Sequence, residues 1–220
     1  VGNAASGQFQ LDVYGEVLAC IYGGRKMGRA GRTDSWPPLK SLLGFLEKAW
    51  QRPDDGIWEV RGGRRHFTHS KVMAWVAADR VVKMSEESGQ EGAVEGLRRM
   101  RDDIHEEVCR WGYDAERNTF TQYYGSTQLD AALLLIPQQV GFLPATDPRV
   151  AGTVEAIQRE LVHDGFMMRY IPDKDAADGL PPGEGAFLAC SFWLVNDLAM
   201  LGRLEEAQAL FDRLLSLRND

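Results

Sequence analysis

Residues 68–82 read THSKVMAWVAADRVV, a stretch with helical periodicity and apolar side chains around most of its circumference. A helix of this kind is buried on all sides within a larger helical protein. The same periodicity recurs along the chain, while strand-like alternation is scarce. We therefore predict an all-α protein with eight helical segments, at about residues 8–22, 35–51, 67–84, 90–110, 127–136, 148–162, 185–202 and 204–217.

These segments alternate in charge along the chain. The first, third, fifth and seventh hold eight charged residues over 61 positions, whereas the other four hold 21 over 67. Because a nearly uncharged helix is buried and a helix with a wide charged face lies outside, the pattern predicts stacked hairpins with an inner and an outer layer. An α/α solenoid or a closed α/α toroid has this organisation. No low-complexity linker divides the chain, so we expect one domain over residues 1–220, with Pro137 ending the fifth segment.

Composition limits the possible partners. The 220 residues carry a formal net charge of −7 and a pI of about 5.2, which argues against nucleic acid or an anionic membrane. No apolar run approaches the roughly 18 residues of a membrane span. The distant cysteines Cys20, Cys109 and Cys190 indicate neither a disulfide framework nor a zinc site, so we expect no metal, no cofactor and a cytoplasmic location. Because the chain starts at Val1 and stops at Asp220 after a helical pattern, we expect a fragment.

Polar side chains recur near the N-terminal ends of the inner segments. They are Asp12 with Glu16, His69 with Lys71, Asp130, and Glu184 just before the seventh segment. Parallel inner helices would bring these ends to one rim, which predicts a shared polar pocket. Capping of free helical N–H groups explains any single member of the set as simply.

The connecting loops have the composition of a carbohydrate site. One holds Trp58, Glu59 and Arg61, another holds Tyr124, and a third holds Arg169 and Tyr170. Sugars stack on flat apolar faces and need polar groups that grip their hydroxyls, and loops on a rigid scaffold commonly supply both. We therefore predict a small carbohydrate as the substrate.

Glu59 is the candidate catalytic acid. It lies between Trp58 and Val60, an apolar setting that favours the protonated carboxyl a general acid needs. The positive charge of Arg61 instead favours the ionised carboxylate. As an alternative, Glu59 and Arg61 form an ion pair in the loop and Trp58 belongs to the core. Glycoside hydrolysis needs a second carboxylate, and the candidates are Asp12, Glu16, Asp54, Asp55, Asp130 and Glu184. Asp54 and Asp55 precede Gly56 and are also explained as turn residues.

Short motifs follow one another along the whole chain. They are QLDVYGE at 10–16, DGIWEVRG at 55–62, FTHSKVMAW at 67–75, YGS at 124–126, LDAA at 129–132, RY at 169–170, EGAFL at 184–188 and CSFWL at 190–194. As an ordered set they resemble the catalytic domain of glycoside hydrolase family 15, the glucoamylases and their bacterial trehalase-like relatives. The trehalase-like branch is the more similar.

This resemblance implies an (α/α)₆ barrel, of which about eight of twelve helices are present here. It implies an inverting mechanism with Glu59 as the general acid and Trp58 shaping the pocket, while Arg169 and Tyr170 grip the sugar. The family's general base would lie beyond residue 220. Glu184 is a possible substitute base, but we assign it to substrate binding. An open toroid exposes apolar helix edges, which favours association and a possible homo-oligomer.

Two functions from different classes follow. The first is an inverting, exo-acting glycoside hydrolase domain on α-glucosides such as trehalose or maltooligosaccharides. In this domain Asp12, His69, Lys71 and the loop residues bind the substrate. The alternative is a non-catalytic α/α scaffold that binds a sugar or a protein partner. A helical repeat adaptor is disfavoured because its fixed sequence period is absent.

Overall fold

The computed structural model describes residues 4–29, 36–60, 62–89, 94–171 and 186–218. Contacts group the chain into two compact units, Val1–Glu59 with Arg64–Arg110, and Val60–Gly63 with Trp111–Asp220. Helices dominate both units, so the all-α prediction is confirmed. That the units form one domain stays a prediction.

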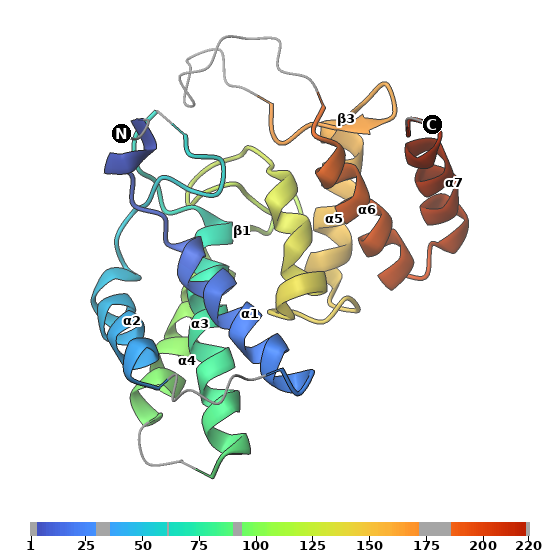
Figure 1. Ribbon diagram of the computed structural model, residues 1–220. Helices are drawn as coiled ribbons and strands as arrows, with labels where there is room; N and C mark the ends of the chain where they lie inside the picture. Colours follow the sequence, from blue (N-terminus) through green and yellow to red (C-terminus); the bar gives the residue numbers. More distant parts are fainter. Residues whose placement is uncertain (1–3, 30–35, 61, 90–93, 172–185, 219–220) are drawn as a thin grey trace. The chain divides into compact units, whose positions relative to one another are not determined.

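The first unit is built around one buried helix. It contains the short η1 (Ala4–Gly7), α1 (Asp12–Lys26), α2 (Trp36–Ala49), α3 (Thr68–Glu87) and most of α4 (Glu95–Trp111). Nearly every side chain from Thr68 to Ser85 on α3 is buried, as the absence of a polar face predicts. Helix α1 lies beside α3 (Figure 1), and Gly15 permits the close approach, since a Cβ there would lie 2.3 Å from the carbonyl oxygen of Met73.

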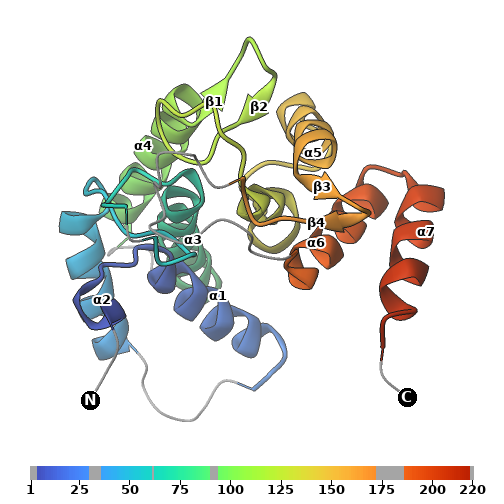
Figure 2. The same ribbon diagram turned by 90° about the horizontal axis from the view of Figure 1, so that it is seen from above.

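The second unit combines helices with two small hairpins. Strand β1 (Tyr113–Asp114) pairs with β2 (Thr119–Phe120), and β3 (Val162–His163) pairs with β4 (Phe166–Met167), both antiparallel. Helix α5 (Pro148–Leu161) packs on β2, and α7 (Leu204–Leu215) packs on α6 (Leu188–Met200) (Figure 2). Gly152 of α5 allows this packing, because a Cβ at that position would lie 2.2 Å from the carbonyl oxygen of Asn118.

The inner and outer classes of helix are only partly as predicted. Helices α2, α4, α5 and α7 each bury one face, as outer helices should. Helix α3 is buried all round, but α1 leaves Val13 45% and Val17 40% exposed, and α6 leaves Phe192 39% exposed. Helices α1 and α6 therefore keep apolar side chains exposed among the described residues, as expected for the helix edges of an open toroid.

The fifth predicted segment is not an α-helix. Residues 131–140 form a turn of 3₁₀-helix, η3 (Ala131–Leu134), followed by a π-helical turn, η4 (Ile136–Val140). Pro137 lies in the first turn of η4, so the prediction that it ends the segment is wrong. Because proline has no N–H to donate, it is tolerated at the start of a helical turn. The segment ends instead at Gly141, with a φ of 68°.

Gln138 fastens this π-helical turn to α6. Its Nε2 donates to Asp197 Oδ1 at 3.0 Å, to the Trp193 carbonyl at 3.1 Å and to the Leu134 carbonyl at 2.8 Å. Its Oε1 accepts from Asn196 Nδ2 at 2.9 Å. Asp197 is 1% exposed, and its Oδ2 has no hydrogen-bond partner among the described residues. A buried carboxyl in this position favours its neutral form.

Asp197 should make the stability of the protein depend on pH. Burial raises its pKa from 3.8 to about 8, so the folded chain keeps a proton that the unfolded chain has already released. The free energy of unfolding should therefore fall as pH rises from about 4 to about 8, by up to about 1.4 kcal/mol per pH unit. Asp197→Asn should remove this contribution, as measured by urea unfolding across the window.

The matched control is Asp212→Asn, because Asp212 also accepts from a glutamine side chain but is exposed. It should leave the pH dependence as it is in the parent protein. Parallel stability curves for the parent and Asp197→Asn would contradict a neutral Asp197.

Candidate active site

The candidate acid lies in a closed loop, residues 54–65, which we call the Glu59 loop. Backbone hydrogen bonds of 2.9 Å in both directions between Asp54 and Arg65 close it. Within the loop, the Glu59 N–H donates to the Gly56 carbonyl at 3.1 Å, and the Glu59 carbonyl accepts from Gln8 Nε2 at 3.1 Å. The backbone of the candidate acid is therefore held from two sides.

The Glu59 side chain is exposed, which differs from the apolar setting that its sequence neighbours predict. Val60 is buried and Trp58 is half-buried, so the loop turns its apolar side chains inward and leaves the carboxyl facing solvent. Glu59 has a φ of 53°, in the left-handed region that non-glycine residues rarely adopt. The surrounding contacts must hold this conformation, and such residues cluster at functional sites.

Gly56 is required by the shape of the same loop. Its φ is 70°, and a Cβ at this position would lie 2.9 Å from the ring of Phe67. Both the backbone angle and the close ring exclude larger residues without a shift of the loop.

Asp54 and Asp55 attach the loop to the segment that leads into α1. Asp54 Oδ2 accepts from the N–H groups of Leu11 at 3.1 Å and of Gly56 at 3.2 Å. Asp55 Oδ2 accepts from the Phe9 N–H at 2.6 Å and from Arg64 Nε at 3.0 Å. Their description as turn residues is therefore incomplete, since both carboxylates make contacts across more than 40 positions of sequence.

Asp12 belongs to the same polar cluster. It is the first residue of α1 and is 6% exposed, and burial followed by the negative charge of Asp54 raises its pKa to about 6. Its Oδ1 has no hydrogen-bond partner among the described residues. Glu16, one turn later, is exposed, so the two carboxylates predicted on one helix face lie in different environments.

His69 and Lys71 are buried and not on an accessible rim. Lys71 is 0% exposed, and its ammonium donates to the carbonyl oxygens of Trp50 and Arg52. Burial lowers the pKa of Lys71 to about 8 and that of His69, which is 3% exposed, to about 4. Both side chains are buried in the described structure, and their contact with substrate stays a prediction. Lys71 instead joins the end of α2 to α3.

The second unit carries the remaining described candidates. The Arg169 guanidinium lies 5.7 Å from the ring centre of Tyr170, which is 5% exposed. The Arg169 carbonyl accepts from the Ala131 N–H at 2.8 Å, so η3 fixes the backbone of this pair. Asp130 caps η3 by accepting from the Ala132 N–H at 2.8 Å, which supports the capping alternative for this residue.

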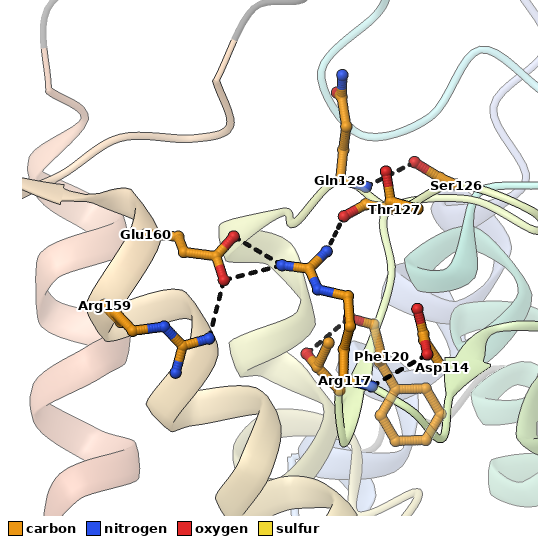
Figure 3. A network of polar contacts seen from close by, with 9 residues as sticks. Asp114, Arg117, Phe120, Ser126, Thr127, Gln128, Arg159 and Glu160 are labelled. Carbon is orange, nitrogen blue, oxygen red and sulfur yellow. Dashed lines mark hydrogen bonds and ion pairs between the residues drawn. The ribbon is translucent and has the colours of Figure 1, made fainter.

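A polar network holds the loop that carries Tyr124, which is half-buried. Arg117 donates through Nη2 to both carboxylate oxygens of Glu160 on α5, at 2.8 and 2.7 Å, and through Nη1 to the Thr127 carbonyl (Figure 3). Ser126 Oγ accepts from the Gln128 N–H at 2.9 Å. Because one guanidinium nitrogen of Arg117 contacts Glu160 and the other contacts the Thr127 carbonyl, this side chain links the loop to α5.

The predicted residues thus fall into two described groups. Trp58, Glu59 and Asp12 lie in the first unit, and Tyr124, Arg169 and Tyr170 in the second, so their convergence on one pocket stays a prediction. Arg61 and Glu184 lie outside the described residues. Among the described ranges, no three His, Cys, Asp or Glu side chains are grouped so as to hold a metal ion, and no helix is both long and apolar enough to cross a bilayer.

A cavity of about 390 Å³ lies in the second unit between α6, α7 and the β3–β4 hairpin. Its lining combines apolar side chains, among them Met167, Leu194 and Leu198, with the charged side chains of Arg213 and Glu206. None of the described candidate residues lines it.

Sequence comparison identifies related proteins over the whole chain. A family model described as "Glycosyl hydrolases family 15" matches residues 1–218. A trehalase of Mycobacterium tuberculosis is 44% identical over 217 residues, which cover 98% of this chain and 31% of that protein. A trehalase of Thermoplasma volcanium is 36% identical over 220 residues, covering 100% of this chain and 34% of that protein. The chain therefore spans about one third of the length of these curated relatives.

Solved structures show the same fold. A structure described as a wild-type glycosidase superposes with a TM-score of 0.77 at 21% identity, covering 94% of this chain and 53% of its own. A glucoamylase from Saccharomycopsis fibuligera superposes with a TM-score of 0.62 at 11% identity, covering 85% and 46%. These likenesses concern the fold, and they confirm the predicted α/α toroid class.

Proposed function

The chain belongs to glycosyl hydrolase family 15, and from this premise we propose that it supplies the general acid of an inverting, exo-acting enzyme on α-glucosides, with trehalose as the first candidate substrate. The observation that carries the proposal is the placement of Glu59. Its carboxyl is exposed on a loop whose backbone is fixed by Gln8 and Gly56, directly after Trp58. The two trehalase relatives support the choice of substrate.

In the proposed reaction, Glu59 donates its proton to the glycosidic oxygen as the bond from that oxygen to the anomeric carbon breaks. Water attacks the anomeric carbon from the opposite face, and a second carboxylate takes the proton that the water loses. One trehalose and one water give two glucose molecules. Glu59 recovers a proton from solvent, which its exposure allows.

The other loop residues are proposed to bind the sugar. Trp58 offers an apolar ring, while Arg61, Tyr124, Arg169 and Tyr170 offer hydroxyl-gripping or stacking groups. Asp12, with its raised pKa, is proposed to contact substrate from the start of α1, and Glu184 to do so from its own loop. We propose that the general base lies outside the 220 residues, as the short coverage of the relatives supports.

The stereochemistry of the product tests this proposal. The full-length protein that contains these 220 residues is mixed with trehalose. The glucose anomers are then followed by proton NMR before mutarotation equilibrates them. Inversion at one centre should give β- and α-glucose in equal initial amounts, since the leaving glucose keeps its α configuration. Initial release of α-glucose alone would contradict inversion, and sugar binding without any hydrolysis would favour the non-catalytic scaffold.

Two further expectations remain proposals. A cytoplasmic location is supported by the three cysteines, none of which forms a disulfide with another described residue. Homo-oligomer formation is supported by the exposed apolar side chains of α1 and α6.

A further inference from the structure

We propose that Asp54 and Asp55 are positioning residues that set the location of the acid-bearing Glu59 loop, an inference that rests on the proposed role of Glu59. Neither carboxylate is needed to touch substrate. Each instead binds backbone N–H groups of the segment before α1, 43 or 46 positions away in sequence.

Asp54 is the buried half of this arrangement. It is 0% exposed, and one oxygen, Oδ2, accepts from both Leu11 and Gly56. The same residue closes the loop through its backbone pairing with Arg65. A single residue therefore joins the start of α1, the base of the loop and the turn at Gly56.

Asp55 is the other half of this arrangement and is also buried. It is 7% exposed, and its Oδ2 receives the Phe9 N–H and the Arg64 Nε, while its own N–H donates to the Phe9 carbonyl at 2.9 Å. Arg64 also donates to the Gly7 carbonyl at 3.1 Å. The guanidinium carbons of Arg52 and Arg64 lie 5.0 and 5.9 Å from the centre of the Phe9 ring. Both ends of the Glu59 loop are thus attached to residues 7–9.

The need for such an attachment follows from Glu59 itself. Its side chain is exposed, so packing does not fix it, and its left-handed backbone is unfavourable unless the loop enforces it. Proton transfer to a leaving oxygen requires hydrogen-bond reach, about 2.6–3.2 Å between heavy atoms. A misplacement of about 1 Å can lower a rate by about a hundredfold. When the contacts of Asp54 and Asp55 are lost, we expect the Glu59 loop to shift by about 1 Å or more.

The test separates a displaced acid from a weakened fold by using two leaving groups. Trehalose needs protonation of its leaving oxygen, whereas fluoride leaves α-D-glucosyl fluoride without a proton from the enzyme. The measured quantity is the ratio of kcat/KM on trehalose to kcat/KM on the fluoride. General destabilisation lowers both values together and leaves this ratio unchanged.

Asp55→Ala should lower the ratio by about ten- to a hundredfold, and Asp55→Asn should restore most of it. The asparagine keeps one oxygen that can accept from Phe9 and Arg64. Asp54→Asn, which also keeps an acceptor at a fully buried position, should resemble Asp55→Asn. The matched control is Asp147→Ala. Asp147 lies at the start of α5 and likewise accepts from a backbone N–H and from an arginine side chain, both belonging to Arg149. It should leave the ratio unchanged.

Glu59→Gln run in parallel separates the two proposals. If Glu59→Gln lowers the ratio and Asp55→Ala does not, the positioning role is wrong while the acid stands. If Glu59→Gln itself leaves the ratio unchanged, the proposed acid is wrong. Failure of Asp55→Asn to rescue the ratio would also overturn the positioning role, because the acceptor oxygen is what the role requires.

Discussion

Glu59→Gln is expected to lower kcat on trehalose by about 10²- to 10⁴-fold, the usual contribution of a positioned proton donor. The amide has the shape of the carboxyl but cannot release a proton to the leaving oxygen. Because Glu59 is exposed and its backbone makes the hydrogen bonds to Gln8 and Gly56, the substitution should leave the fold intact. Steady-state kinetics and thermal unfolding of the same preparation measure both effects.

The control for this variant is Glu95→Gln, an exposed glutamate in the first turn of α4 that pairs with Arg98 and Arg99. It should keep the parent kcat. A Glu59→Gln enzyme within a few-fold of the parent on trehalose would remove Glu59 from the mechanism.

Gly15→Ala is expected to destabilise the first unit by about 3 kcal/mol, the range of an overpacked core. The added Cβ would lie 2.3 Å from the Met73 carbonyl oxygen, and this neighbour is backbone in the middle of α3. Helix α1 must therefore move away from α3, and its attachment to the Glu59 loop must move with it. Urea unfolding followed by circular dichroism measures the loss.

The matched control is Gly23→Ala, in the same helix but with no atom within 4 Å of the added Cβ. Alanine is the better helix former by about 1 kcal/mol, so this variant should be as stable as the parent or more so. Equal stability changes for the two variants would contradict the close crossing of α1 and α3.

The helices were predictable where local pattern determines them. Helix α3 lacks a polar face over 68–82 and is buried all round, and the segment predicted at about 148–162 is α5, Pro148–Leu161. One helix was predicted at about 127–136, where the structure has 3₁₀ and π turns over 131–140, because 3₁₀, α and π turns differ too little in apolar periodicity to be separated. Gln138 in the π-helical turn contacts α6, more than 50 positions away, and no local pattern reveals such contacts.

The site was predictable in its residues but not in their environments. Apolar neighbours suggested a desolvated Glu59, whereas the turn at Gly56 directs its side chain to solvent. Lys71 was predicted to contact substrate from the end of a helix, but its buried ammonium donates hydrogen bonds to the carbonyl oxygens of Trp50 and Arg52. Asp54 and Asp55 were explained as turn residues because their partners Leu11 and Phe9 are distant in sequence. The only local sign that these carboxylates have further partners was the pair Arg64 and Arg65 later in the same loop.

The role of Glu59 as the proton donor is tested most directly by its response to the leaving group. The kcat/KM values of the parent enzyme and of Glu59→Gln are compared on trehalose and on α-D-glucosyl fluoride. A general acid predicts a loss of at least about a hundredfold on trehalose and a change of only a few-fold on the fluoride. Equal losses on the two substrates would show that Glu59 does not protonate the leaving group.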